Sequence, residues 1–216
     1  AVAASAARHF VTVERGARLA VGMAGGAARV VGHGVLRTFT RAARGVVSKE
    51  LIPDWSPNMP PAATSLPATR RDGAAAVYFT ACVNRIFGRA GDLRKPSLQE
   101  AMVEVSARAG MPLWIPDDIG GHCCATIWHS KGYEEGNGIM ANRTVESLWR
   151  WSDEGKLPIV CDASSCSFGI ASEIGPYLGP ENRERHAALT ILDSVAWAHD
   201  RLLPRLSIRR KAGAAV

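Results

Sequence analysis

The chain has 216 residues, 47% of them hydrophobic and 21% charged, and this balance excludes a disordered or collagen-like protein. Its net charge of +6 is of the sign that nucleic-acid-binding proteins carry. However, residues 1–71 carry ten Lys and Arg against three acidic residues, whereas residues 72–216 carry sixteen against seventeen. Because the whole excess belongs to an N-terminal arm, we do not expect a nucleic-acid partner.

The N-terminal arm, residues 1–52, combines basic residues with many alanines and glycines. From residue 3 to about residue 48 its pattern predicts two or three helical pieces, which the glycines weaken. Its surface suits anionic lipid at a membrane, an acidic partner protein, or water alone. The most apolar window, residues 17–36, is interrupted by Arg18, Arg29 and His33, so we expect no bilayer span. The arginines of the arm are Arg8, Arg15, Arg18, Arg29, Arg37, Arg41 and Arg44.

A proline-rich linker separates the arm from the rest of the chain. Five prolines lie between residues 53 and 72, and proline both lacks an amide donor and disfavours helix in the residue before it. We therefore divide the chain into a helical basic arm (1–52), a linker (53–72) and a cysteine-rich domain (73–216).

Beyond the linker, short apolar runs alternate with helical patterns. Residues 74–80 (AAAVYFT), 112–115 and 157–161 are typical of buried strands. The Ser97-x-x-Glu100 capping box predicts a helix that ends at Gly110. Further helices are predicted over about 137–154, ended by Gly155, and over 182–203. This alternation predicts right-handed parallel crossovers, and hence a small α/β layer fold over about residues 73–205.

Four of the five cysteines follow predicted strands. Cys82 comes after the first strand, Cys123 and Cys124 after the second, and Cys166 after the third. Because ligands of α/β folds collect beyond the carboxyl ends of the strands, we expect these thiols to share one crevice. The fifth, Cys161, ends an apolar strand and is best explained as a small buried hydrophobe. An odd number of cysteines fits poorly with a complete disulfide framework and indicates a reducing, cytoplasmic compartment.

The spacing of the four cysteines indicates a metal cluster. Four thiolates suit either Zn²⁺ or an iron–sulfur cluster. Structural zinc sites usually take their ligands as two close pairs, whereas Cys82 and Cys166 stand alone and Cys123 and Cys124 are adjacent. We therefore favour an iron–sulfur cluster. The glycines before the adjacent pair would let backbone approach sulfur, and amides at the start of a following helix would stabilise thiolate charge.

The polar residues around the cysteines leave alternatives open. His122 and His129 are either ligands or, more commonly, polar neighbours of such a site. Lys131 either offsets the charge of a cluster or is a solvated surface lysine. Cys166 could also be a nucleophilic thiolate at a helix start, although the sequence fixes no histidine partner for it. A thiol-based redox or transferase enzyme and a zinc-bound or metal-free docking module therefore remain as alternatives.

The cysteine pattern resembles that of a known family. Its elements are Cys82, then Cys123-Cys124 with Trp128-His129-Ser130-Lys131-Gly132-Tyr133, then Asp162-Ala163-Ser164-Ser165-Cys166. They are similar to the cysteine-rich CCG domain at the carboxyl end of FAD-linked oxidases of the D-lactate dehydrogenase and glycolate oxidase type. The resemblance covers about residues 73–175, and the arm and linker resemble the segment that joins this domain to an upstream ferredoxin-like module.

The resemblance also implies a ligand set. The family's cluster-binding pattern maps onto Cys82, Cys123, Cys124 and Cys166, which are enough for a [4Fe–4S] cluster. Ala125 stands where the pattern has glycine, and Ala163 stands where it has the first cysteine of Cys-x-x-Cys.

What the resemblance implies for function is the electron-transfer end of an oxidoreductase. An upstream part would bind FAD and oxidise a 2-hydroxy acid such as D-lactate or glycolate, and iron–sulfur centres would pass the electrons to a cytochrome, a quinone or another acceptor. The sequence has no Gly-rich nucleotide loop set between a strand and a helix, so we expect no substrate-oxidising site in this chain. A first residue other than Met agrees with a fragment or a processed protein. We expect it in the cytoplasm or peripherally at the inner face of the membrane.

Overall fold

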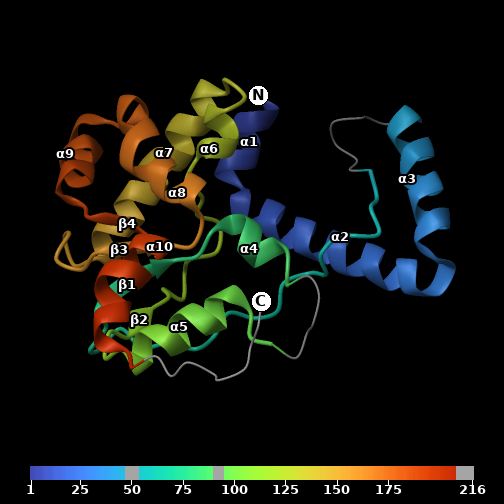
Figure 1. Ribbon diagram of the computed structural model, residues 1–216. Helices are drawn as coiled ribbons and strands as arrows, with labels where there is room; N and C mark the ends of the chain where they lie inside the picture. The colour runs from blue at the N-terminus through green and yellow to red at the C-terminus, as the bar shows by residue number, and fades with distance from the viewer. Residues whose placement is uncertain (47–53, 90–94, 208–216) are drawn as a thin grey trace.

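The computed structural model describes residues 1–46, 54–89 and 95–207, and its larger body contains a parallel sheet of short strands (Figure 1). Within these residues the sheet has four strands in the spatial order β2-β1-β3-β4. They are β1 (Ala76–Phe79), β2 (Leu113–Trp114), β3 (Ile159–Cys161) and β4 (Ile191–Asp193). β1 pairs with β2 on one side and with β3 on the other, and every pairing is parallel. The α/β class and the parallel sheet predicted from the sequence are confirmed.

Helices fill the connections between the strands. The chain passes from β1 to β2 through α4 (Cys82–Ile86) and α5 (Leu98–Arg108), and from β2 to β3 through α6 (Thr126–His129) and α7 (Glu134–Trp151). Between β3 and β4 lie α8 (Ser164–Phe168), the π-helical turn η1 (Gly169–Glu173), the 3-10 turn η2 (Gly175–Tyr177) and α9 (Pro180–Ala188). After β4 come α10 (Ser194–Ala196), η3 (Trp197–Leu202) and η4 (Leu203–Arg205).

The strand order opens a crevice at the carboxyl ends of the two central strands. From β1 the chain moves to β2 on one side, and from β2 it crosses over to β3 on the other side of β1. Right-handed crossovers then put α5 on one face of the sheet and α7 and α9 on the other. The helix contacts agree, because α7 packs against α9 whereas α5 packs against η3. The loops after β1 and β3 therefore diverge, and such a point is where α/β folds bind ligands.

Local sequence signals account for most of these elements. The Ser97 hydroxyl accepts a hydrogen bond from the Glu100 amide at 3.2 Å, and the Glu100 carboxylate accepts one from the Ser97 amide at 2.7 Å, so the predicted capping box is confirmed. The three predicted strands are present as β1, β2 and β3. α7 begins and ends somewhat earlier than the predicted 137–154.

The single helix predicted over 182–203 is wrong. The structure breaks this stretch into α9, β4 and the helical turns that follow. β4 is held by its pairing with β3, and the Ile159 amide of β3 donates to the Thr190 carbonyl at 2.8 Å just before β4 begins. A strand of three residues has too few positions to show an alternating pattern. Its apolar residues also fit the spacing of a helix, and the sequence therefore predicts a helix there.

Residues 1–46 of the arm form three helices, in agreement with the predicted two or three helical pieces: α1 (Val2–Arg8), α2 (Phe10–Val31) and α3 (His33–Val46). Residues 47–52 of the predicted arm lie outside the described residues. α1 packs against α7, where Arg143 donates to the carbonyls of Ala7 at 2.8 Å and Arg8 at 3.0 Å. α2 then runs outward from the sheet domain, and α3 stands at its far end (Figure 1). The first helix is therefore packed into the body of the protein, whereas the third projects from it.

Residues 54–72 of the predicted linker run without a helix along the sheet domain. The Ala63 amide donates to the Ile86 carbonyl at 2.9 Å, and the Ile115 amide donates to the Thr69 hydroxyl at 2.8 Å. These contacts make the segment a strap fastened to α4 and to the end of β2. Among the helices of the described residues, none is both long enough and apolar enough to cross a bilayer.

Candidate metal centre

The structure brings four cysteines from three loops together. Cys82 begins α4 directly after β1, Cys123 and Cys124 lie between β2 and α6, and Cys166 lies in α8 after β3. The Sγ atoms of Cys82 and Cys123 are 3.4 Å apart. The Cys124 thiol lies close enough to the thiols of Cys123 and Cys166 for both to lower its pKa. The sulfurs therefore form a row, which we call the thiol row, in the order Cys82, Cys123, Cys124 and Cys166; Cys82 is partly buried and the other three are buried.

The loop that carries the adjacent pair needs unusual backbone conformations. Gly121 has a φ of 81° and Ala125 a φ of 68°, both in the left-handed region. Glycine adopts this region freely, whereas alanine is strained there. Ala125 occupies the position where the CCG pattern has glycine, and its φ gives a physical reason for a glycine there. The next residue, Thr126, begins α6 and helps to lower the pKa of Cys124, and its hydroxyl donates to the Ser165 carbonyl at 3.5 Å.

Asp162 holds the loop of Cys82 to the loop of Cys166. It directly follows β3, and its carboxylate accepts hydrogen bonds from the Ala81 amide at 2.7 Å and from the Tyr78 hydroxyl at 3.0 Å. Burial raises the pKa of Asp162, and burial together with the neighbouring carboxylate raises the pKa of Tyr78. Because Ala81 caps the helix that Cys82 begins, this contact fixes where the first thiol of the row lies.

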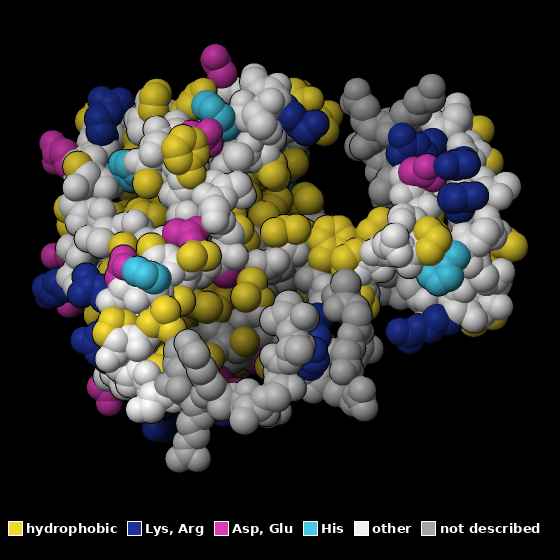
Figure 2. Space-filling model, in the orientation of Figure 1, with side chains coloured by type: hydrophobic (Ala, Val, Ile, Leu, Met, Phe, Trp, Pro, Cys, Tyr) yellow, Lys and Arg dark blue, Asp and Glu magenta, His cyan; other side chains and the backbone are white. Residues whose placement is uncertain are grey.

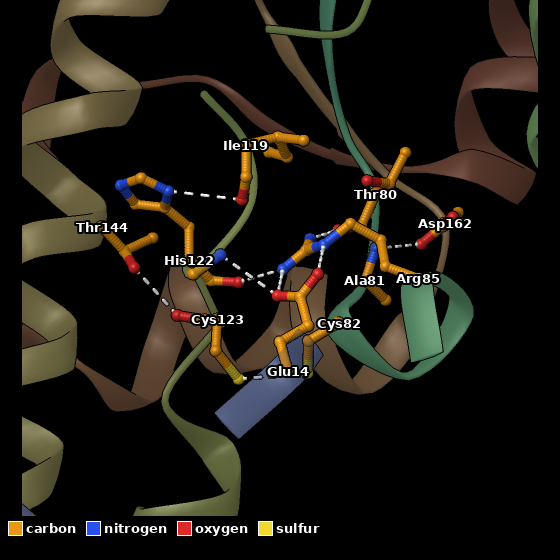
Figure 3. A network of polar contacts seen from close by, with 11 residues as sticks. Glu14, Thr80, Ala81, Cys82, Arg85, Ile119, His122, Cys123, Thr144 and Asp162 are labelled. Carbon is orange, nitrogen blue, oxygen red and sulfur yellow. Dashed lines mark hydrogen bonds and ion pairs between the residues drawn. The ribbon is translucent and has the colours of Figure 1, made fainter. Parts of the chain in front are cut away.

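A buried ion pair lies beside the Cys82 end of the thiol row (Figure 3). Arg85 on α4 donates to the carboxylate of Glu14 on α2 through Nε at 2.8 Å and through Nη2 at 2.7 Å. The side chains of Arg85 and Glu14 are only 4% and 12% exposed. Such a two-fold contact between a guanidinium and a carboxylate is among the stronger hydrogen-bond arrangements in proteins.

The same ion pair reaches both loops that carry the first two cysteines. Arg85 also donates to the carbonyl of Thr80 and, at 2.6 Å, to that of His122. Glu14 accepts a further hydrogen bond from the Gly121 amide at 3.1 Å. Burial disfavours the charge of Arg85, but the contacts with Glu14 outweigh it and raise the Arg85 pKa, so the guanidinium stays charged. The pair therefore places a fixed cation next to the sulfurs and ties α2 to their loops.

The direction of the pKa shift alternates along the thiol row. The hydrogen bond with Cys123 lowers the pKa of Cys82, and the charge of Arg85 adds to this effect. Hydrogen bonds from Cys123 and Cys166 lower the pKa of Cys124. Because Cys123 and Cys166 contact these thiolates and are buried, their own pKa values are raised. In the metal-free protein the thiols of the row therefore titrate as a coupled set, in which negative charge is favoured at Cys82 and Cys124 over Cys123 and Cys166.

The neighbouring histidines and the lysine lie outside the thiol row. The ring of His122 points away from the sulfurs toward α7, and its Nε2 is 2.8 Å from the Ser147 hydroxyl (Figure 3). Burial is the main cause that lowers the pKa of His122. His129 lies 3.8 Å from a carboxylate oxygen of Glu173, and Lys131 is exposed. These contacts favour the role of polar neighbours for both histidines and a solvated position for the lysine.

The four thiols of the row are the candidate metal donors of the site. Across residues 1–46, 54–89 and 95–207, no three His, Cys, Asp or Glu side chains converge as the ligands of one metal ion do. A tetrahedral zinc site takes four donors around one point. A cluster takes its thiolates on several irons, so the chemistry of the four thiols suits either kind of site. Cys161 stands apart, fully buried at the end of β3, where burial raises its pKa.

Sequence reasoning singled out the cysteines but not the residues that support them. Glu14 is the single acidic residue among the first 49, in an arm rich in arginine. Its isolated position in the sequence is the feature that could have indicated a special role for it. Arg85 follows Cys82 at a spacing that places both on one side of α4. Asp162 directly follows a strand, as the cysteine loops do.

Comparison of the chain with protein-family models, with curated proteins and with solved structures finds no match. We therefore infer the function from the residues of the site.

Proposed function

We propose that this chain is the iron–sulfur electron-transfer part of a flavin-dependent 2-hydroxy-acid dehydrogenase. One observation carries the proposal: four cysteines from three separate segments, three of them buried and one partly buried, lie in one row at the carboxyl ends of a parallel sheet. The resemblance of the cysteine pattern to the CCG domain is the basis for the flavin and for D-lactate or glycolate as the substrate. The FAD-binding and ferredoxin-like parts would then lie upstream in the same protein, with a cytochrome or quinone as the acceptor.

The four ligands would be Cys82, Cys123, Cys124 and Cys166. The thiolate is the form that binds metal, and the contacts that lower the pKa of Cys82 and Cys124 prepare two of the four. When bound, an iron–sulfur cluster accepts and releases electrons. The Arg85 cation and the Thr126 amide lie against the sulfurs, and charge and hydrogen bonds of this kind set the reduction potential of a cluster.

A cleft gives the outside of the protein access to this region. It has a volume of about 440 Å³ and lies between α2 and the loop that precedes the adjacent cysteines. Glu14, Arg85 and Gly121 are among its lining residues. An electron donor or acceptor that enters this cleft would contact the ion pair of Arg85 and Glu14, which lies beside the Cys82 end of the row.

The proposal is tested by the iron, zinc and acid-labile sulfide content of the chain purified without oxygen. We expect about four iron and four sulfide per chain. Cys124→Ser should abolish the iron, because it removes the central thiolate of the row. Cys161→Ser is the matched control, since it exchanges the same atoms at a buried cysteine outside the row and should retain the iron.

Three results would each overturn the proposal. They are zinc without sulfide, no metal under anaerobic conditions, and full iron content in Cys124→Ser. Circular dichroism of both variants separates loss of the cluster from loss of the fold.

A second candidate is a thiol redox protein, favoured by the contact between Cys82 and Cys123. Their sulfurs lie 3.4 Å apart, and the lowered pKa of Cys82 favours it as the attacking group in such chemistry. Joining the two thiols as a disulfide would pass two electrons and two protons to an oxidised partner. This candidate predicts a metal-free protein that loses two hydrogen masses on oxidation, a change that Cys82→Ser would prevent.

A further inference from the structure

The projecting helix α3 is strongly amphipathic. Its apolar residues recur at helical spacing along one face, and its arginines recur along the opposite face. The apolar face consists of Val35, Leu36, Phe39, Ala42, Ala43 and Val46. The basic face consists of Arg37, Arg41 and Arg44.

The apolar face of α3 is exposed to solvent. Val35, Phe39 and Val46 are 61%, 70% and 87% exposed, and no residue of this helix is buried. Figure 2 shows apolar side chains along the outer rim of the arm, with Lys and Arg gathered on the side toward the viewer. A soluble helix normally turns such a face to a core, so this one is available to another surface.

The strap contacts part of the polar face of α3, while Arg37 and Arg41 remain exposed. Arg41 contacts the carboxylate of Asp54 at 3.3 Å, and the Trp55 amide donates to the Thr40 hydroxyl at 3.3 Å. The Trp55 ring also stacks with His33 and donates to its Nδ1 at 3.1 Å. The strap therefore holds α3 by its polar face, and the apolar face points away from the strap.

The charge of the arm indicates what the apolar face meets. Among residues 1–46 there are seven arginines and one acidic residue, Glu14, which is buried against Arg85. On the neighbouring α2, Arg18 and Arg29 are exposed and lie a quarter turn from its own exposed apolar stripe. That stripe consists of Leu19, Met23 and Val30. A basic amphipathic helix with valine, leucine and phenylalanine on its apolar side is the pattern of helices that lie in a membrane surface.

We propose that α3, with the outer part of α2, binds the surface of an anionic phospholipid membrane. The valine and phenylalanine side chains of α3 enter the acyl boundary, and the arginines of the arm face the phosphate groups. The helix lies in the plane of the surface, and the sheet domain with its thiol row remains in water. The inference stands on the arm alone and does not depend on whether the thiols hold a metal.

The test is cosedimentation of the full chain with vesicles. We expect binding to vesicles of equal parts phosphatidylglycerol and phosphatidylcholine, and little binding to phosphatidylcholine alone. Phe39→Asp should weaken binding to the anionic vesicles at least tenfold, as should Arg37→Glu. Val195→Asp is the matched control, because Val195 on α10 is also 70% exposed but lies on the sheet domain, and it should bind as the parent does.

Since α3 has no buried residue, these variants should keep the thermal melting of the sheet domain. Equal binding to both kinds of vesicle, no binding, or binding that Phe39→Asp leaves intact would overturn the proposal. A dimer seen by sedimentation equilibrium without vesicles, and dissociated by Phe39→Asp, would also overturn it, because the apolar face would then belong to a second copy of the chain.

Discussion

Replacing Glu14 with alanine tests whether the buried ion pair holds the arm to the cysteine loops. The substitution removes two hydrogen bonds from Arg85 and one from the Gly121 amide. It also leaves a guanidinium that is 4% exposed without its carboxylate. Breaking a buried ion pair on one side typically costs about 3–5 kcal/mol, because the remaining charge stays out of water without compensation.

The structure indicates the lower part of this range. Arg85 keeps the carbonyls of Thr80 and His122 as acceptors, so its charge is still partly compensated in the variant. We therefore expect Glu14→Ala to lower the free energy of unfolding by about 3 kcal/mol. For a protein of this length the melting temperature should fall by about 6–12 °C.

The assay is urea and thermal unfolding of both proteins in the same metal state, with Arg8→Ala as the control. Arg8 pairs with Glu135 at 2.8 Å and also joins the N-terminal helices to the sheet domain, but these side chains are 55% and 62% exposed. Removal of that solvent-exposed pair should cost about 0–1 kcal/mol. A double-mutant cycle with Arg85→Met should show that the loss in Glu14→Ala comes mainly from the unpaired guanidinium. The reasoning is refuted if Glu14→Ala costs no more than Arg8→Ala.

Three other predictions concern the loops and the sheet. Ala125→Gly should raise the free energy of unfolding by about 1 kcal/mol, because glycine takes a φ of 68° without strain, whereas Ala101→Gly within α5 should lower it by about 1 kcal/mol. Gly121→Ala should lower the free energy of unfolding by about 2 kcal/mol, because the added Cβ would lie 2.2 Å from a side-chain atom of α2. In Gly120→Ala the added Cβ meets no atom within 4 Å, and the free energy of unfolding should fall by less than about 0.5 kcal/mol. Burial raises the pKa of Tyr78, so its neutral phenol contributes fully to the stability of the fold below about pH 10, and this contribution falls as the pH rises further. Because Tyr78 does not ionise near pH 10 in the folded protein, Tyr78→Phe should leave the tyrosine absorbance titration near pH 10 unchanged.

Each of these predictions has a contrary outcome. Destabilisation by Ala125→Gly would mean that the left-handed residue is not strained. Equal losses in Gly121→Ala and Gly120→Ala would mean that α2 does not approach the cysteine loop closely. A tyrosine signal near pH 10 that disappears in Tyr78→Phe would mean that this phenol ionises in the folded protein.

The sequence by itself determined the elements whose signals are local. The capping box of Ser97 and Glu100 is a four-residue signal that predicts the start of α5. The apolar runs before the cysteine loops predict the three strands β1, β2 and β3. The alternation of these elements predicted a parallel sheet, and parallel strands bring their carboxyl ends to one edge. For this reason the order of strands and cysteines along the chain was enough to predict that Cys82, Cys123, Cys124 and Cys166 would meet.

Only the tertiary structure decided the features that depend on distant partners. β4 has three residues and exists through its pairing with β3, so no local period distinguishes it from the helix predicted there. Glu14 and Arg85 come from segments on either side of the linker, and no spacing along the chain predicts that two such residues will pair. The orientation of α3, with its apolar face outward, likewise depends on Asp54 and Trp55 of the strap. Propensity, capping and period act within one or two turns of chain, whereas ion pairs, strand pairing and exposure depend on contacts that form only when the whole chain folds.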